Sequence, residues 1–178
     1  MTPRELEEYR ALRATIRERG TARVWLFGAG LGAWAALVLT TASTMTVPVA
    51  TLLPLLVLAG VFEGVLALHV GVERVGRYLQ VFYEAGEDSG ERRWEETAMA
   101  FGKDAAKGTP DPLFAHIFLF AIAWNFVPAV LGGALPVEWL MIGSLHILLM
   151  ARVVTAKRHA AVQRPADLAR FQELRQKQ

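Results

Sequence analysis

The chain has 178 residues, of which 53% are hydrophobic and none is cysteine, and its formal net charge is only +2. No charged residue occurs from Val24 to Phe62 or from Pro112 to Val137. Runs of this length exclude a soluble enzyme, a nucleic-acid-binding domain and a disordered chain, because a helix needs about 20 apolar residues to cross a bilayer. The absence of cysteine excludes disulfides, thiolate metal sites and cysteine nucleophiles.

The pattern predicts an all-α polytopic membrane protein with four transmembrane helices in two hairpins and amphipathic cytoplasmic helices. The predicted spans are 23–44, 49–71, 112–132 and 137–154. The chain then divides into a cytoplasmic amphipathic helix at 1–22, a first transmembrane hairpin at 23–71, a cytoplasmic connector with a juxtamembrane helix at 72–111, a second transmembrane hairpin at 112–154 and a basic cytoplasmic tail at 155–178.

The first predicted helix begins with a capping box, in which Thr2 is the N-cap and Glu5 is the acidic partner. Gly20 is a predicted stop or kink before the first span. Near the other end of the chain, Pro165 is predicted to interrupt the tail, so that 167–177 forms a separate surface helix. A further short helix is expected at 92–101 in the connector.

Proline and glycine mark the outer ends of the second hairpin. Gly132, Gly133 and Pro136 predict a tight turn between the last two spans. Pro128 removes one backbone donor in the third span and predicts a kink there. We expect the nearby Asn125 to form a hydrogen bond across helices that stabilises their packing. The alternative is that Asn125 lines a substrate path.

The positive charges predict the orientation. Of the 19 Lys and Arg, six precede or begin the first span, six lie between the second and third spans, and seven follow the apolar part of the fourth. The two short hairpin turns carry none. Because positive residues stay on the cytoplasmic side, both termini and the middle connector are predicted to be cytoplasmic, in an inner (plasma) membrane.

Small residues predict close helix packing. Two G-x-x-x-G pairs occur within the spans, Gly28 with Gly32 and Gly60 with Gly64. The first pair overlaps a G-x-G-x-x-A pattern typical of dinucleotide sites, but a preceding strand and a following acidic residue are missing. The sequence therefore favours helix packing over nucleotide binding.

Glu63 is the most informative single residue, because it lies inside the second predicted span. A carboxylate at that depth costs about 2.5–3.5 kcal/mol unless it is paired, protonated or hydrated. Two interpretations follow. Glu63 either couples a proton or cation to transport, or it pairs with another helix in a structural role.

Three histidines, His69, His116 and His146, lie on three different predicted spans, close to the cytoplasmic boundary. Two facing histidines could ligate a haem b iron. Together with Glu63 or Glu73 they could instead hold a divalent metal, and His69 with Glu73 has the i, i+4 spacing of two ligands. The alternative is that these histidines only satisfy local hydrogen bonds and no cofactor is bound.

The segment from Glu73 to Arg77 has the spacing E-R-x-x-R, which resembles the arginine-rich segment of the membrane-associated glutathione and eicosanoid enzymes. In that family the segment follows the first span, whereas here it follows the second. The resemblance covers about a dozen residues, and it carries no function to this chain.

Three functional hypotheses follow. The first is a non-enzymatic membrane subunit or scaffold, which associates with itself or with a larger membrane complex in the lipid bilayer and not with nucleic acid. The second is a haem- or metal-binding redox protein that uses the three histidines. The third is a small oligomeric transporter that is coupled to protons or cations through Glu63.

Overall fold

The computed structural model describes residues 1–44, 47–84 and 111–177. Within these ranges every regular element is helical and none is a strand, which confirms the predicted all-α class. Three helical stretches are long and apolar enough to cross a membrane: Pro3–Thr44, Pro48–Tyr83 and Pro136–Gln176. Most of the predicted connector, including the helix expected at 92–101, lies outside the described residues.

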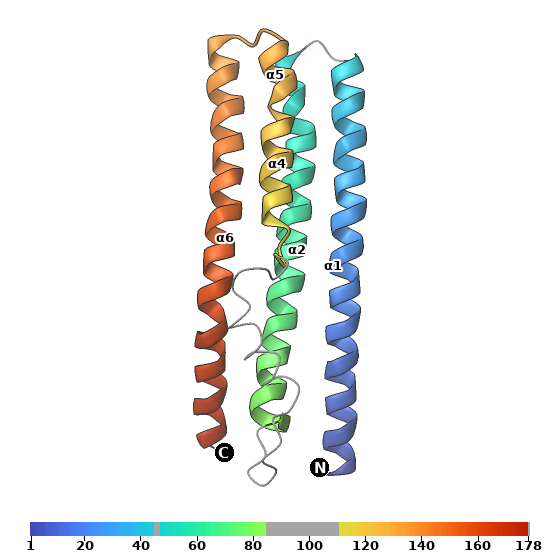
Figure 1. The fold of residues 1–178 in the computed structure, drawn as a ribbon, viewed down its shortest axis with the longest axis vertical. Helices are drawn as coiled ribbons and strands as arrows, with labels where there is room; N and C mark the ends of the chain where they lie inside the picture. The colour runs from blue at the N-terminus through green and yellow to red at the C-terminus, as the bar shows by residue number, and fades with distance from the viewer. Residues whose placement is uncertain (45–46, 85–110, 178) are drawn as a thin grey trace.

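The long helices run side by side along the length of the molecule (Figure 1). In chain order the elements are α1 (Pro3–Thr44), η1 (Pro48–Thr51), α2 (Leu52–Leu79), η2 (Gln80–Glu84), α4 (Ala115–Asn125), α5 (Val127–Leu131) and α6 (Pro136–Gln176). The contacts are most extensive between α1 and α2, and α2 also packs against α6 and α4. Both chain ends lie at one end of the molecule, and η1 and the α5–α6 turn lie at the other (Figure 1).

The core lies where α2, α4 and α6 meet. On α2 the fully buried Leu58, Phe62 and Val65 follow the spacing of one helix face. Phe62 meets Phe118 of α4 edge to face, with ring centroids 5.2 Å apart, a geometry that aromatic pairs prefer. Val153 of α6 is also fully buried and belongs to the same cluster.

The inner face of α6 follows a seven-residue repeat, since its buried residues alternate steps of four and three: Ile142, His146, Leu149, Val153 and Ala156. This spacing is the one that keeps a single seam of a helix against its neighbours. It also places His146 in the interior.

The third predicted span differs from the expectation. It consists of α4, with 11 residues, and α5, with 5 residues, separated at Phe126. Pro128 has no N–H to continue the α4 ladder, and the carbonyl of Phe126 instead accepts bonds from Ala129 and Val130. The combined stretch Ala115–Leu131 is shorter than the three long helices, so the four-span, two-hairpin arrangement is not confirmed.

The predicted breaks at Gly20 and Pro165 do not occur, because α1 and α6 are continuous through both positions. Contacts with α2 explain this. On either side of Gly20, Arg19 lies over Gly71 and Arg23 bonds to His69. Tertiary contacts of this kind outweigh the helix-breaking tendency of single residues.

On either side of Pro165, α6 is also held to α2. Arg164 pairs with Glu73, and Asp167 lies 3.7 Å from Arg74. The separate surface helix expected after Pro165 is therefore the last part of α6.

Two predicted end signals are confirmed. The backbone N–H of Thr2 donates to the Glu5 carboxylate, and the backbone N–H of Glu5 donates to the Thr2 hydroxyl at 3.3 Å, which completes the capping box. Gly133 has a φ of +66°, a conformation that glycine adopts readily, in the turn before Pro136 begins α6.

Beyond the apolar part of the bundle, residues 3–20, 72–83 and 157–176 continue as helices, and we call this region the stalk. Aromatic rings hold it together: the ring of Phe171 on α6 meets Tyr78 at 5.7 Å and Phe82 at 6.4 Å, and Tyr9 of α1 meets Tyr83 at 5.7 Å. The three helices therefore stay packed along the stalk.

Candidate functional site

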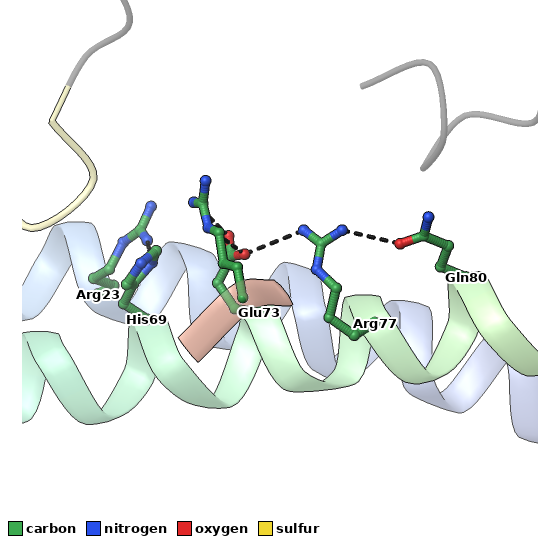
Figure 2. Close-up of polar contacts among 6 residues, drawn as sticks. Arg23, His69, Glu73, Arg77 and Gln80 are labelled. Carbon is green, nitrogen blue, oxygen red and sulfur yellow. Dashed lines mark hydrogen bonds and ion pairs between the residues drawn. The ribbon is translucent and has the colours of Figure 1, made fainter. Parts of the chain in front are cut away.

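Glu73 is the centre of a polar cluster that joins α2 to α6. Its carboxylate accepts hydrogen bonds from Arg164, at 2.8 Å from Nε and 3.0 Å from Nη2, and from Arg77 at 3.2 Å. Arg77 also donates to Oε1 of Gln80 at 3.0 Å, so the side chains form a row along one face of α2 (Figure 2). The i, i+4 and i, i+3 spacings place them there. The side chain of Arg77 is 8% exposed, so its buried charge depends on this pairing.

His69 lies one helical turn before Glu73 but has a different partner. Its Nδ1 is 3.1 Å from Nη1 of Arg23, which comes from α1 (Figure 2). Because a guanidinium is always protonated, Arg23 donates and Nδ1 accepts, which places the imidazole proton on Nε2. The predicted ligand pair of His69 and Glu73 is thus engaged by arginines from two other parts of the chain.

A cavity of about 10 Å³ lies between these clusters, lined in part by His69, Glu73, Arg77 and Arg164. This volume accommodates about one water molecule. Its walls carry charges of both signs. The cluster is therefore a polar contact between helices, and its cavity is too small for an organic substrate.

Glu63 forms a bidentate ion pair with Arg152 of α6. Nε of Arg152 lies 2.8 Å from Oε1, and Nη2 lies 2.9 Å from Oε2. This parallel arrangement is the strongest geometry for an arginine and a carboxylate. The two side chains are 48% and 45% exposed, so the pair lies on the outside of the bundle. The structure thus pairs Glu63, and it does not direct the carboxylate into an interior path.

Asn125 connects four helical segments within the apolar half of the molecule. Its Oδ1 accepts from Nε1 of Trp34 at 3.1 Å, and its Nδ2 donates to the carbonyl of Thr51 at 2.9 Å and to Nε2 of His146 at 3.1 Å. Nδ1 of His146 donates to the carbonyl of Ile142 at 2.8 Å. Asn125 is 1% exposed and uses three of its four hydrogen-bonding positions. This is the bond across helices that the sequence predicts for Asn125.

His116 lies at the start of α4, close to Asp111 and Lys157. Nζ of Lys157 is 3.1 Å from Asp111 and 3.5 Å from Nε2 of His116. Burial alone would raise the pKa of Asp111, but Lys157 and the backbone amides of Leu113 and Ala115 outweigh it, and the pKa lies below its usual range. Asp111 therefore fixes the start of α4 and ties it to α6.

The three histidines do not share a partner. His69 meets Arg23, His146 meets Asn125, and His116 meets Lys157. In both buried histidines the lone pair that would bind a metal already accepts a hydrogen bond. Among residues 1–44, 47–84 and 111–177, no group of three or more His, Asp or Glu is placed to hold a metal ion. The donors as arranged do not fit a haem or metal centre.

The predicted packing glycines fall into two groups. A Cβ added at Gly64 would meet the side chain of Leu26, so this residue lies at the α1–α2 contact. Gly30, which the G-x-x-x-G pattern passes over, lies against Val61 in the same contact. At the other three glycines an added Cβ would have no atom within 4 Å among the described residues, apart from the neighbouring backbone of its own helix: Gly28, Gly32 and Gly60.

A groove of about 470 Å³ opens at the end of the molecule where α1, η1 and α5 meet, with Thr41, Thr51 and Pro128 in its wall. The hydroxyl of Thr41 already donates to the carbonyls of Leu37 and Val38, and the hydroxyl of Thr51 donates to that of Pro48. Among the described residues of its wall, these hydroxyls donate within their own helices, and the groove offers mainly apolar surface.

Sequence reasoning missed the partners in these clusters. From the sequence, Arg23 and Arg152 count only among the positive residues that predict the orientation. Both fall at the margins of charge-free runs, and that signal could have nominated them as partners for Glu63 and His69. Trp34 gives a weaker indication of a polar contact, because its indole ring carries one N–H donor in the middle of an apolar run.

The sequence matches no protein-family model, no curated protein and no solved structure.

Proposed function

We propose that this chain is a non-enzymatic subunit or scaffold of a membrane assembly. The observation that carries the proposal is the continuity of α1 and α6 from the apolar half into the stalk, past Gly20 and Pro165. A rod of this kind holds a membrane-embedded surface and a stalk surface at a fixed distance. The polar clusters support the same role, because each one ties two or more helices together.

We place the molecule in the bilayer with both chain ends and the stalk on the cytoplasmic side, where positive residues are retained. From Pro136 to Lys157 the axis of α6 covers about 31 Å, close to the ~30 Å hydrocarbon core. In this placement α4 and α5 form the remaining crossing of a four-span bundle. The segment starts at the level of Lys157, which pairs with Asp111 just before α4, and α5 ends at the turn into α6 at the opposite end of the molecule (Figure 1).

The two alternative functions have less support. A redox role would require His69 and His146 to give up their hydrogen bonds to Arg23 and Asn125 before either could bind a metal. A transport role would require a polar path past Glu63, whose carboxylate is paired on the outside of the bundle. Such a path would have to form between chains.

An absorption spectrum and metal analysis of the protein, extracted from its native membrane in mild detergent, test the proposal. Single replacements His69→Gln, His116→Gln and His146→Gln are compared with the unchanged protein. We expect no Soret band, no stoichiometric metal and an unchanged particle size in His116→Gln, whose histidine is exposed. A Soret band that is lost on replacing two of the histidines would overturn the proposal in favour of a redox protein.

A further inference from the structure

One stripe of α2 is exposed over the whole apolar half of the helix. It comprises Leu53, Leu56, Gly60, Glu63 and Ala67, and we call it the α2 outer face. Steps of three and four residues keep these side chains on one side of the helix. Lipid tails can cover leucine and alanine without cost. They cannot do the same for a carboxylate.

The ion pair of Glu63 with Arg152 lies at the edge of this face, inside the apolar zone. In the placement proposed above it is about 8 Å deeper than Lys157, at 1.5 Å per residue. A charged side chain exposed to the hydrocarbon is costly, and pairing removes only part of that cost because the remaining lone pairs and N–H groups face lipid. Nearly half of each side chain is still exposed. A polypeptide that brings polar groups to the pair would remove the rest.

We infer that a second copy of this chain covers the α2 outer face, with the two Glu63–Arg152 pairs meeting across a two-fold axis normal to the membrane. The α2 outer face and the adjoining Arg152 of α6 present one negative and one positive group side by side, so the surface is complementary to itself. A two-fold axis brings Glu63 toward Arg152 of the partner subunit and repeats the same contact in the other direction. Four alternating charges then satisfy one another.

Gly60 provides an independent reason for close approach. It lies one turn from Glu63 on the same face, and apart from the neighbouring backbone of its own helix no atom of the described residues lies within 4 Å of the position where a Cβ would be. Glycine at an exposed position of a membrane helix lets a second backbone come near, which favours helix association. The combination of an open glycine and a self-complementary ion pair favours a second copy over a partner with charges of a single sign.

This inference rests on the proposed role as an assembly subunit, and thiol crosslinking tests it. The chain has no cysteine, so a single introduced cysteine reports on one position. Gly60→Cys is treated in native membranes with a short, membrane-permeant bismaleimide, which adds one thiol at each end and so joins two cysteines. Gly32→Cys on α1 is the matched control. Gly32 is also a glycine in a predicted span with open space around it. It lies two residues from Gly30, which contacts Val61, so Gly32 and Gly60 lie at a similar height along the bundle.

We expect Gly60→Cys to give a crosslinked product of twice the 19.6 kDa chain mass, at about ten times the yield of Gly32→Cys. A tenfold ratio corresponds to a preference of about 1.4 kcal/mol for the orientation that brings the two α2 outer faces together. Adding Glu63→Gln and Arg152→Gln together, which removes both charges and leaves no unpaired one, should lower that yield toward the control. Circular dichroism verifies that the variants remain helical.

Other results overturn the inference. Equal yields at Gly60→Cys and Gly32→Cys would show random collision, and a dominant Gly32→Cys product would move the interface to α1. A Gly60→Cys product with a different protein would replace the second copy by another partner but keep the proposed function. No product at Gly60→Cys from particles that are still larger than one chain would overturn this interface alone, whereas particles of a single chain would overturn the proposed function as well.

Discussion

Arg152 meets Glu63 through two parallel hydrogen bonds of 2.8 and 2.9 Å between α6 and α2, on the outside of the apolar half of the bundle. The chain thus carries a neutral, polar feature on a surface that otherwise suits lipid. Its position accounts for the carboxylate inside an apolar helix without a transport path through a single chain. It also identifies the part of the apolar surface that the proposed second copy would cover.

A double-mutant cycle tests the energetic coupling of this pair. Glu63→Gln or Arg152→Gln alone leaves one charge without its hydrogen-bonded partner, and we expect each to lower the free energy of unfolding by about 1–3 kcal/mol. The double replacement should cost less than the sum of the two, because it removes both charges together. The measurement is unfolding in mixed micelles. Strictly additive single effects would show that the two residues do not interact.

Asn125→Ala should be among the most destabilising polar replacements. It leaves Nε1–H of Trp34, the carbonyl of Thr51 and Nε2 of His146 without their partner, at an expected total cost of about 2–4 kcal/mol. Trp34→Phe removes only one of the three bonds and should cost about 1 kcal/mol. Equal effects of the two replacements would contradict a role for Asn125 as the junction of four segments.

Two neighbouring glycines give a matched test of the α1–α2 contact. Gly30→Ala places a methyl group against Val61 and should cost about 1–3 kcal/mol, as overpacking does. Gly32→Ala meets no atom and should change the stability of the monomer by about zero, or raise it slightly because alanine favours helix. A larger loss at Gly32 than at Gly30 would contradict the observed packing.

We expect the contribution of Asp111 to the stability of the folded protein to be lost in acid. Because its pKa is lowered in the folded protein, by Lys157 and backbone amides that outweigh its burial, its contribution is fully present above the ordinary aspartate pKa of about 3.9 and disappears as the pH falls through the lowered value. Thermal unfolding of the unchanged protein and of Asp111→Asn between pH 7 and pH 3 measures this. The difference between the two should shrink below about pH 4, and a difference that grows in acid would contradict the assignment.

The sequence predicts those parts of the fold that depend on local pattern. Long charge-free runs are sufficient to predict the apolar helices, and the capping box at Thr2 and Glu5 and the turn at Gly133 follow from neighbouring residues. Gly20 and Pro165 were misleading, because the contacts that keep α1 and α6 continuous come from α2, many residues away in sequence. A single-residue breaking tendency cannot reveal them.

The polar clusters could be predicted only in part, for a similar reason. Glu63 and Asn125 stand out as polar residues within apolar helices, and both take part in contacts between helices. Their partners depend on how α1, α4 and α6 are rotated about their own axes, which hydropathy does not specify. The spacing of His69 and Glu73 suggests a ligand pair, yet arginines from α1 and α6 reach the two side chains separately.

Native mass spectrometry of particles released from the membrane with their lipid tests the central claim most directly, because one spectrum reports both the number of chains and any tightly bound cofactor. We expect particles that contain at least two polypeptide chains, two copies of the 19.6 kDa chain in the simplest case, with no added mass of haem. Particles that contain a single chain, or a chain with one stoichiometric haem, would contradict it.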